Sequence, residues 1–346
     1  MYQSISFNDP EFKTKLVKQF KLNGVAVINN VFTDIECDTY MDGIVNNFIR
    51  LGTGLKKDDI KTWTDYNLPP QTRPGLYQSL MTNLQQIWDI RSHQNIKSIF
   101  KILYYKLRNK EIDEFIVSGD GINIKPNMGP LHNPQKSKDW PHLDQTIRKD
   151  TYKCIQGQAV LTNTTASFVA SPKSHLLYEE ILDKLGIDSN DKSNWAKIKP
   201  ENIEEIKTII LAKKGSKWQI PILSKKGSFI VWASSLVHSA KLQDKIEPIS
   251  HGDIYLGWRC VVYVCYRPKE EFTLKEIEKR KQVFETNRVT NHWGTKIFPK
   301  KQGGRFLFTE KRHDIIEAML NNPITVYDKI NKPVLNDNQK KLLGII

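Results

Sequence analysis

The sequence predicts a mainly β core, built as an antiparallel sandwich or barrel and flanked by α-helices at both ends. Short runs rich in β-branched and aromatic residues, separated by Gly, Pro, Asn and Ser, fill residues 115–268. The segments on either side repeat apolar residues at helical spacing. We expect a single domain over 1–346, with a helical flank over 1–114, the β core over 115–268 and a helical C-terminal extension over 269–346.

The N-terminal flank contains helix starts and one strand. A capping residue and a first-turn proline open a helix over 11–20, which Gly24 ends. A short apolar strand over 25–31 follows, and the capping-box pattern Thr33–Glu36 opens the next helix. Apolar residues return at helical period over 80–107, so this flank is predicted to be mostly helical.

The β core is expected to be interrupted once. A polar, helix-capable insertion over 175–214 separates its strands, with the best helical segment at 203–211. The C-terminal extension carries a capping box at Thr273 and a second helical segment over 313–320. The expected strands of the core are 114–117, 121–125, 153–161, 167–170, 217–220, 228–233 and 258–266.

The composition of the chain argues against membrane, secreted and disulfide-stabilised proteins. No run reaches the roughly 18 apolar residues of a membrane span, and the first residues lack the basic-then-apolar order of a secretory signal. The four cysteines form no Cys-x-x-Cys pair, which argues against a disulfide framework or a zinc knuckle. We therefore expect a cytoplasmic protein in a reducing compartment.

The net charge of the chain is +14, with an isoelectric point of about 9.4. The basic residues occur in scattered groups of two or three, which favours ordinary solvated surface lysines. A small-molecule substrate, anionic if the charge serves binding, would suit this field. A nucleic acid is the less favoured partner because no nucleic-acid-binding motif is present. The sequence does not indicate an oligomeric state.

Two His-x-Asp pairs are candidates for metal binding: His142 with Asp144, and His251 with Asp253. On a strand, residues i and i+2 point to the same side, so His142 and Asp144 can offer a nitrogen and an oxygen to one ion. The second pair lies in a turn-like segment, and no convincing strand precedes a later histidine. The first pair is therefore favoured.

A third metal ligand is expected from a later strand. His238 follows a glycine turn, an apolar strand and a small-residue bend. Two histidines and one carboxylate on one face of an octahedron leave three adjacent positions open, which is the arrangement of non-haem iron oxygenases. Fe(II) in such a site has room for O2 and for a chelating 2-oxo acid.

Arg259 begins an otherwise apolar strand. An arginine that enters a barrel core needs an anion, and its planar fork matches a carboxylate. Arg259 is therefore the candidate for binding the distal carboxylate of 2-oxoglutarate. A purely structural pair between Arg259 and an acidic residue is the alternative, and Arg267 is the second candidate.

Three further side chains are candidates for the pocket. Gln156 and Gln158 lie two apart on one strand and share a face, which is either the barrel interior or an exposed outer surface. Trp140 could shape the pocket, although core packing is the default for tryptophan. Among the other histidines, His175 is expected to be a structural hydrogen-bonding residue. Surface or locally bonded side chains are expected for His93, His132, His292 and His313.

Four ordered features resemble the phytanoyl-CoA dioxygenase-like family of Fe(II)/2-oxoglutarate oxygenases. They are His142-Leu-Asp144, Ser167–His175, Gly227–His238 and Arg259–Tyr266. Within the second, Lys173 stands where that family usually has glycine.

The resemblance implies a double-stranded β-helix core (jelly roll, cupin-like) flanked by N- and C-terminal α-helices. It also implies an Fe(II)-dependent dioxygenase, most often a hydroxylase, that uses O2 and converts 2-oxoglutarate to succinate and CO2. In that family the residues matching His142, Asp144 and His238 bind iron, and the residue matching Arg259 binds 2-oxoglutarate. The substrate is not indicated.

Two other functions remain open at this point. A cupin-like metalloenzyme that does not use 2-oxoglutarate would share the fold and the metal but would not need Arg259. A noncatalytic binding module would use the basic charge for a nucleic-acid or protein partner, and an intact ligand set argues against it.

Overall fold

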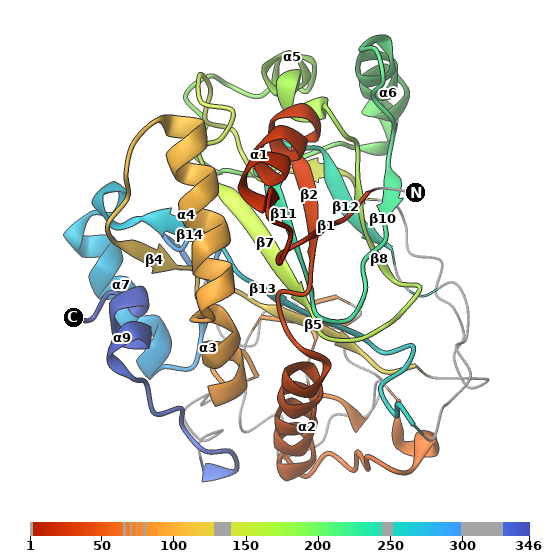
Figure 1. Ribbon diagram of the computed structural model, residues 1–346, viewed down its shortest axis with the longest axis vertical. Coiled ribbons are helices and arrows are strands. Elements are labelled where there is room, and N and C mark those ends of the chain that lie inside the picture. The colour runs from red at the N-terminus through yellow and green to blue at the C-terminus, as the bar shows by residue number, and fades with distance from the viewer. Residues whose placement is uncertain are drawn as a thin grey trace.

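The computed structural model describes residues 3–64, 67–69, 71–73, 75–78, 81–127, 140–241, 243, 252–298 and 328–346. These residues form two large β-sheets whose facing side chains share a core, with helices packed against the outer face of each sheet. Figure 1 shows α1 and α4 lying along one face of the larger sheet. The prediction of a mainly β core with flanking helices is confirmed.

The N-terminal flank begins with the short strand β1 (Ile5–Ser6) and the helix α1 (Phe12–Asn23). Helix α1 ends at Gly24, whose φ of +73° lies in the left-handed region that glycine adopts without strain. A Cβ atom at this position would lie 2.5 Å from Nδ1 of His175. Strand β2 (Val25–Asn29) follows directly, so Gly24 both ends the helix and allows the close approach of the His175 ring.

The predicted capping box opens α2 (Asp34–Arg50). The helical period over 80–107 is divided between α3 (Gln85–Arg91) and α4 (Gln94–Arg108). His93 caps α4 by accepting a hydrogen bond from the Asn95 N–H at 3.3 Å. The break was not evident from periodicity because apolar residues keep their helical spacing across it.

The larger sheet has nine strands in the part of the chain that the structure describes. Its order is β1-β2-β11-β7-β13-β5-β3, and β14 pairs with both β4 and β7. All of these pairs are antiparallel except β1 with β2. Its other strands are β3 (Leu76–Tyr77), β4 (Phe115–Val117), β5 (Ile122–Lys125), β7 (Ile155–Val160), β11 (Ser228–Ala233), β13 (Arg259–Tyr263) and β14 (Tyr266–Pro268).

The smaller sheet is fully antiparallel, in the order β10-β8-β12-β6-β9. A separate two-stranded ribbon joins β15 (Val289–Thr290) to β16 (Ile297–Phe298). The strands of the smaller sheet are β6 (His142–Leu143), β8 (Ser167–Ala170), β9 (Ala196–Lys197), β10 (Ile220–Ile222) and β12 (His238–Lys241).

Two strand predictions need correction. The strand expected over 217–220 lies instead at Ile220–Ile222, because Gln219 has a φ of +40° that interrupts the extended chain. The run over 258–266 is not one strand. Its first part, β13, pairs with β5, whereas its last part, β14, pairs with β4, so the chain changes neighbours between them.

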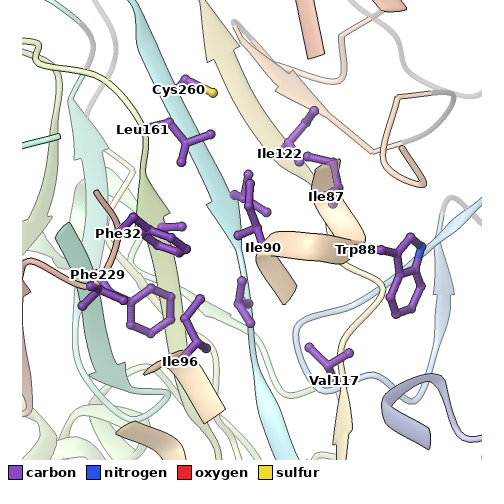
Figure 2. Close-up of a cluster of buried hydrophobic side chains, with 14 of the residues drawn as sticks. Phe32, Ile87, Trp88, Ile90, Ile96, Val117, Ile122, Leu161, Phe229 and Cys260 are labelled. Carbon is purple, nitrogen blue, oxygen red and sulfur yellow. The ribbon is translucent and has the colours of Figure 1, made fainter. Parts of the chain in front are cut away.

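Strand β11 shows how the larger sheet separates two cores. Phe229, Val231 and Ala233 belong to the cluster packed under the helices, whereas Ile230 and Trp232 belong to the cluster shared with the smaller sheet. This is the alternation expected of a strand buried on both faces. Figure 2 shows Phe229 within the cluster on the helical side.

The insertion over 175–214 carries two helices, α5 (Tyr178–Lys184) and α6 (Ile203–Ala212). Both pack on the outer side of the smaller sheet, in a cluster that includes Leu143 and Val237. Leu143 and Val237 therefore point away from the larger sheet, and their neighbours in the chain point toward it.

The C-terminal extension contains α7 (Leu274–Glu285), which starts at the capping box predicted from Thr273, and α9 (Asp337–Leu343). The helix expected over 313–320 lies outside the described residues. Short 3-10 helices occur at Ile60–Thr62, Ser174–Leu176, Pro200–Asn202 and Lys269–Glu271.

None of the helices in the described ranges has the length and apolar character needed to cross a bilayer. The cysteines Cys37, Cys154, Cys260 and Cys265 are all buried and free.

Candidate metal centre and cavity

His142 and His238 lie side by side on neighbouring strands of the smaller sheet. They are direct partners in the β6–β12 pair, and their ring centroids are 4.3 Å apart. Because Leu143 and Val237 point outward, the alternation of the strands turns both imidazoles inward, toward the larger sheet. Both histidines are buried.

Asp144, the residue after β6, completes a compact group. Its Oδ1 lies 3.7 Å from Nε2 of His142, and its Oδ2 lies 3.3 Å from Nε2 of His238. The ligand atoms of the three side chains lie within 4.8 Å of one another, so the group could hold a metal ion. The structure thus brings together the three residues predicted as ligands.

The backbone sets the tautomer of both imidazoles. Nδ1 of His142 is 3.1 Å from the carbonyl oxygen of Trp140, and Nδ1 of His238 is 2.9 Å from that of Leu236. A carbonyl oxygen only accepts, so each Nδ1 carries the proton and each Nε2 keeps its lone pair. A hydrogen bond at Nδ1 orients the ring and prepares Nε2 for metal binding.

The pKa shifts in the group agree with a neutral imidazole beside an ionised carboxylate. Burial, together with the neighbouring His238, lowers the pKa of His142 to about 3. Burial opposes ionisation of Asp144, but the surrounding imidazoles, led by His292, outweigh it and hold the pKa of Asp144 well below its usual value. His142 and Asp144 are therefore in the protonation states that a cation requires.

Hydrogen bonds hold both the side chain and the backbone of Asp144. Gln156 on β7 donates from Nε2 to Oδ2 of Asp144 at 3.1 Å. The indole N–H of Trp293 donates to the backbone oxygen of Asp144 at 2.8 Å, and the Asp144 N–H donates to the oxygen of Ser234 at 2.9 Å. Gln156, predicted as a residue of the pocket, thus contacts the carboxylate of Asp144 but is not among the described residues that line the cavity.

A cavity of about 830 Å³ opens beside this group, between the two sheets. His142, Asp144 and His238 line it, as do two of the predicted pocket residues, Trp140 and Gln158. The ring of Trp140 stacks on that of His142, with centroids 4.4 Å apart and planes 9° apart. A cavity of this size is typical of small-molecule sites.

Arg259 lines the same cavity from β13 of the larger sheet. It is 2% exposed, and its Nε donates to Oδ1 of Asn123 at 2.9 Å. Its Nη2 atom is buried and has no hydrogen-bond partner among the residues that the structure describes. No acidic residue in the described part of the chain pairs with Arg259, so the alternative of a structural ion pair finds no support there.

Arg267, the second candidate, has other contacts. Its guanidinium pairs with Glu271 at 2.7 Å and donates to the Trp293 oxygen at 3.1 Å. It is not among the described residues that line the cavity.

His292 is a correction to the sequence-based prediction, which treated it as a surface or locally bonded histidine. It lines the cavity, with Nε2 at 3.6 Å from Oδ2 of Asp144 and Nδ1 in a short hydrogen bond to Asp120. Burial lowers the pKa of His292, but the carboxylates of Asp120 and Asp144 outweigh burial and raise that pKa well above its ordinary value. No motif around His292 signals this position, because its partner Asp120 lies 172 positions earlier in the chain.

The remaining candidates lie elsewhere. His175 is buried, with Nε2 at 3.2 Å from the Lys21 oxygen, which is the structural role predicted for it. Lys173 has a φ of +72°, the conformation for which glycine is the usual residue. Of the second His-x-Asp pair, His251 lies outside the described residues, and Asp253 accepts a hydrogen bond from the Tyr255 N–H in a turn.

Two cationic side chains besides Arg259 line the cavity, Arg73 and Lys296. The guanidinium of Arg73 lies 4.2 Å from the ring centroid of Trp140. Nζ of Lys296 donates to the backbone oxygen of Lys192 at 2.9 Å. The acidic residues among the described lining are Asp120 and Asp144, both of which already contact His292.

No family model matches the chain. Among curated proteins, the chain is similar to "Ava biosynthesis cluster protein O" of Aspergillus versicolor, with 23% identity over 288 residues that cover 81% of this chain and 87% of the relative.

Two solved structures share the fold. One is the GlcNAc-inducible gene 2 protein (DUF1479) of Candida albicans, with a TM-score of 0.54 and 16% identity over 99% of this chain and 84% of that one. The other is a hypothetical protein of Escherichia coli, with a TM-score of 0.55 and 13% identity over 99% and 85% of the two chains. The epimerase SnoN, whose structure contains Fe3+, alpha-ketoglutarate and nogalamycin RO, reaches a TM-score of 0.46 at 12% identity over 75% and 84%. That value is too low to infer a common fold.

Proposed function

We propose that the protein is an Fe(II)- and 2-oxoglutarate-dependent dioxygenase that hydroxylates a small molecule. One observation carries this proposal. A group of two histidines and one carboxylate shares a cavity with Arg259, a buried arginine with one nitrogen that finds no partner in the described part of the chain. The two histidines and the carboxylate suit a metal ion, and Arg259 suits an anionic cosubstrate.

The donor set of His142, Asp144 and His238 fits Fe(II). Two neutral imidazole nitrogens and one carboxylate oxygen, without sulfur, are the ligands of mononuclear non-haem iron sites. Both Nε2 atoms are free to bind because backbone carbonyls hold the Nδ1 protons. When bound there, Fe(II) would supply the activation of O2 that couples decarboxylation of 2-oxoglutarate to oxidation of the substrate.

Arg259 fits one carboxylate of a dicarboxylic acid, and Gln158 fits a donor group of another ligand. Within the described residues, Nη2 of the buried Arg259 guanidinium has no partner, and a buried donor without a partner is costly unless a ligand binds there. Asn123 holds the Nε side of Arg259, so the open edge of the guanidinium is fixed in direction. Oε1 of Gln158, in the same cavity, is also buried and has no partner among the described residues, so it can accept a hydrogen bond from a hydroxyl group.

The arrangement of the two sheets supports the finer fold assignment. We infer a double-stranded β-helix of the jelly-roll type, similar to the phytanoyl-CoA dioxygenase-like enzymes, within a single oxygenase domain over 1–346. Metal ligands on the smaller sheet and the anion-binding arginine on the larger sheet, facing one cavity, are consistent with that family.

The substrate is proposed to be a small molecule with an anionic group. Arg73 and Lys296 line the cavity, and the carboxylates described there already contact His292. The curated relative is named for a biosynthesis cluster, which fits an enzyme that modifies a small molecule.

Succinate formation tests the proposal. The protein, incubated with Fe(II), ascorbate, O2 and 2-oxoglutarate, is expected to form succinate slowly even without its substrate. The variant Asp144→Ala should lose this activity, whereas Asp253→Ala, which changes the carboxylate of the other His-x-Asp pair, should retain it. Equal loss in both folded variants, or no 2-oxoglutarate binding by the metal-loaded protein, would contradict the proposal. The latter result would favour a cupin-like metalloenzyme that does not use 2-oxoglutarate.

A further inference from the structure

A second group of side chains adjoins the candidate metal centre. Asp120, Cys265 and His292 place ligand-type atoms within 4.8 Å of one another, and His292 also reaches Asp144. Asp120 and His292 lie outside the motifs that suggested the oxygenase, and Cys265, which lies within Arg259–Tyr266, was assigned no role there. Their arrangement therefore calls for its own explanation.

Asp120 is held rigidly and orients the His292 ring. It is 2% exposed, its Oδ1 accepts the Gly121 N–H at 2.6 Å, and its backbone oxygen accepts Nη2 of Arg91 at 2.6 Å. Its other carboxylate oxygen, Oδ2, contacts Nδ1 of His292. This contact fixes the rotation of the ring and directs Nε2 toward Asp144.

Hydrogen bonds hold the chain on both sides of His292. Thr290 and Gly119 exchange two hydrogen bonds, N–H to carbonyl at 2.8 Å and N–H to Oγ1 at 2.9 Å. On the other side, the Trp293 indole donates to the backbone of Asp144 at 2.8 Å. Two consecutive residues, His292 and Trp293, therefore approach Asp144 through its side chain and its main chain.

We propose that His292, oriented by Asp120, is a positioning residue for Asp144. Together with the Gln156 amide, which donates to the same oxygen at 3.1 Å, it holds the carboxylate so that it faces the two histidines of the metal centre. This inference rests on the proposed function only in taking Asp144 as a metal ligand. Outer partners of this kind typically change metal affinity by about 10- to 100-fold.

The test compares two double variants that remove the same pair of charges. Asp120→Asn/His292→Leu removes the ring donor at position 292 and leaves the Gln156 amide on Asp144, whereas Asp120→Asn/His292→Gln keeps a donor at position 292 as well. Co(II) alone is the probe, added to the metal-free full-length chain, with its absorption spectrum and dissociation constant as readouts. Thermal melting of the metal-free proteins reports folding separately.

The leucine variant is expected to bind Co(II) about 10- to 100-fold more weakly than wild type and with an altered spectrum. The glutamine variant should bind within a few-fold of wild type, with the original spectrum. If both variants match wild type, His292 has only a packing role and the proposal is wrong. The proposal is also wrong if wild type binds two Co(II) ions and both variants lose only one, because Asp120, Cys265 and His292 would then form a separate metal site.

The comparison of Co(II) binding by the two variants does not depend on the oxygenase reaction. Wild type that binds Co(II) but not 2-oxoglutarate would contradict the proposed function while the comparison of the two variants still decides the role of His292. Wild type that binds no Co(II) at all would overturn both.

Discussion

His142 and His238 are direct partners across two short antiparallel strands, and the Nδ1 of each faces the carbonyl oxygen of the residue two positions earlier. The two imidazoles thus receive the same support from the same local geometry. This symmetry leaves both Nε2 atoms directed at one point beside Asp144.

Replacing His238 with alanine is expected to abolish tight metal binding, because it removes one of three ligands and leaves two. The loss should exceed the roughly 100-fold that the removal of an outer partner causes. Titration with Co(II) measures it. His93→Ala is the control, since His93 contacts Glu36 at 3.3 Å and is not among the described residues lining the cavity. Equal affinity in the two variants would show that His238 is not a ligand.

Replacing Arg259 with alanine is expected to weaken 2-oxoglutarate about 30-fold to several thousand-fold, since truncating one partner of a buried charge pair costs about 2 to 5 kcal/mol. A 2-oxo acid without the distal carboxylate, such as 2-oxobutyrate, serves as the comparison ligand. Its affinity should hardly change, because Arg259 is assigned to the distal group. Parallel losses for both acids would point to a general disturbance of the cavity.

Gly24→Ala should destabilise the protein more than Gly186→Ala. Both glycines have positive φ, +73° and +64°, so each substitution costs about 1–2 kcal/mol of backbone strain. At Gly24 the new Cβ would also lie 2.5 Å from His175, whereas nothing lies within 4 Å at Gly186. Overpacking adds about 1–3 kcal/mol at the first site, which urea unfolding can measure. A smaller loss at Gly24 than at Gly186 would contradict the close packing.

His175 should make the protein less stable in mild acid. Burial lowers its pKa from 6.5 to about 4, so below pH 6.5 the unfolded chain binds a proton that the folded chain does not. The stability that neutral His175 contributes is complete above pH 6.5 and is lost as the pH drops toward 4. The free energy of unfolding should therefore fall by about 2 kcal/mol between pH 7 and pH 5. Urea unfolding of metal-free wild type and His175→Gln at these two pH values isolates it. The same pH dependence in both proteins would refute the assignment.

Much of the site followed from local rules in the sequence. The i, i+2 spacing of His142 and Asp144 predicted a shared side, and the apolar strand before His238 predicted a third ligand nearby. Both depend on alternation along a strand, which is visible in a single sequence. The capping boxes before α2 and α7 are local in the same sense.

What could not be predicted depends on contacts between distant segments. Nothing in the sequence indicates that His292 and Asp120 meet, or that Arg259 has no acidic partner among the described residues. The pattern of charged residues also did not show which cations are buried. Arg280 looks like a surface cation, yet it is buried and donates to backbone oxygens from three segments.

Anaerobic titration of the Fe(II)-loaded protein with 2-oxoglutarate tests the central claim most directly. If His142, Asp144 and His238 hold the iron and Arg259 anchors the cosubstrate, one equivalent of 2-oxoglutarate should bind and produce the visible charge-transfer absorption of an iron–2-oxo acid chelate. The absorption should be absent without iron and from Asp144→Ala. Iron binding without this absorption, and without measurable uptake of 2-oxoglutarate, would contradict the account.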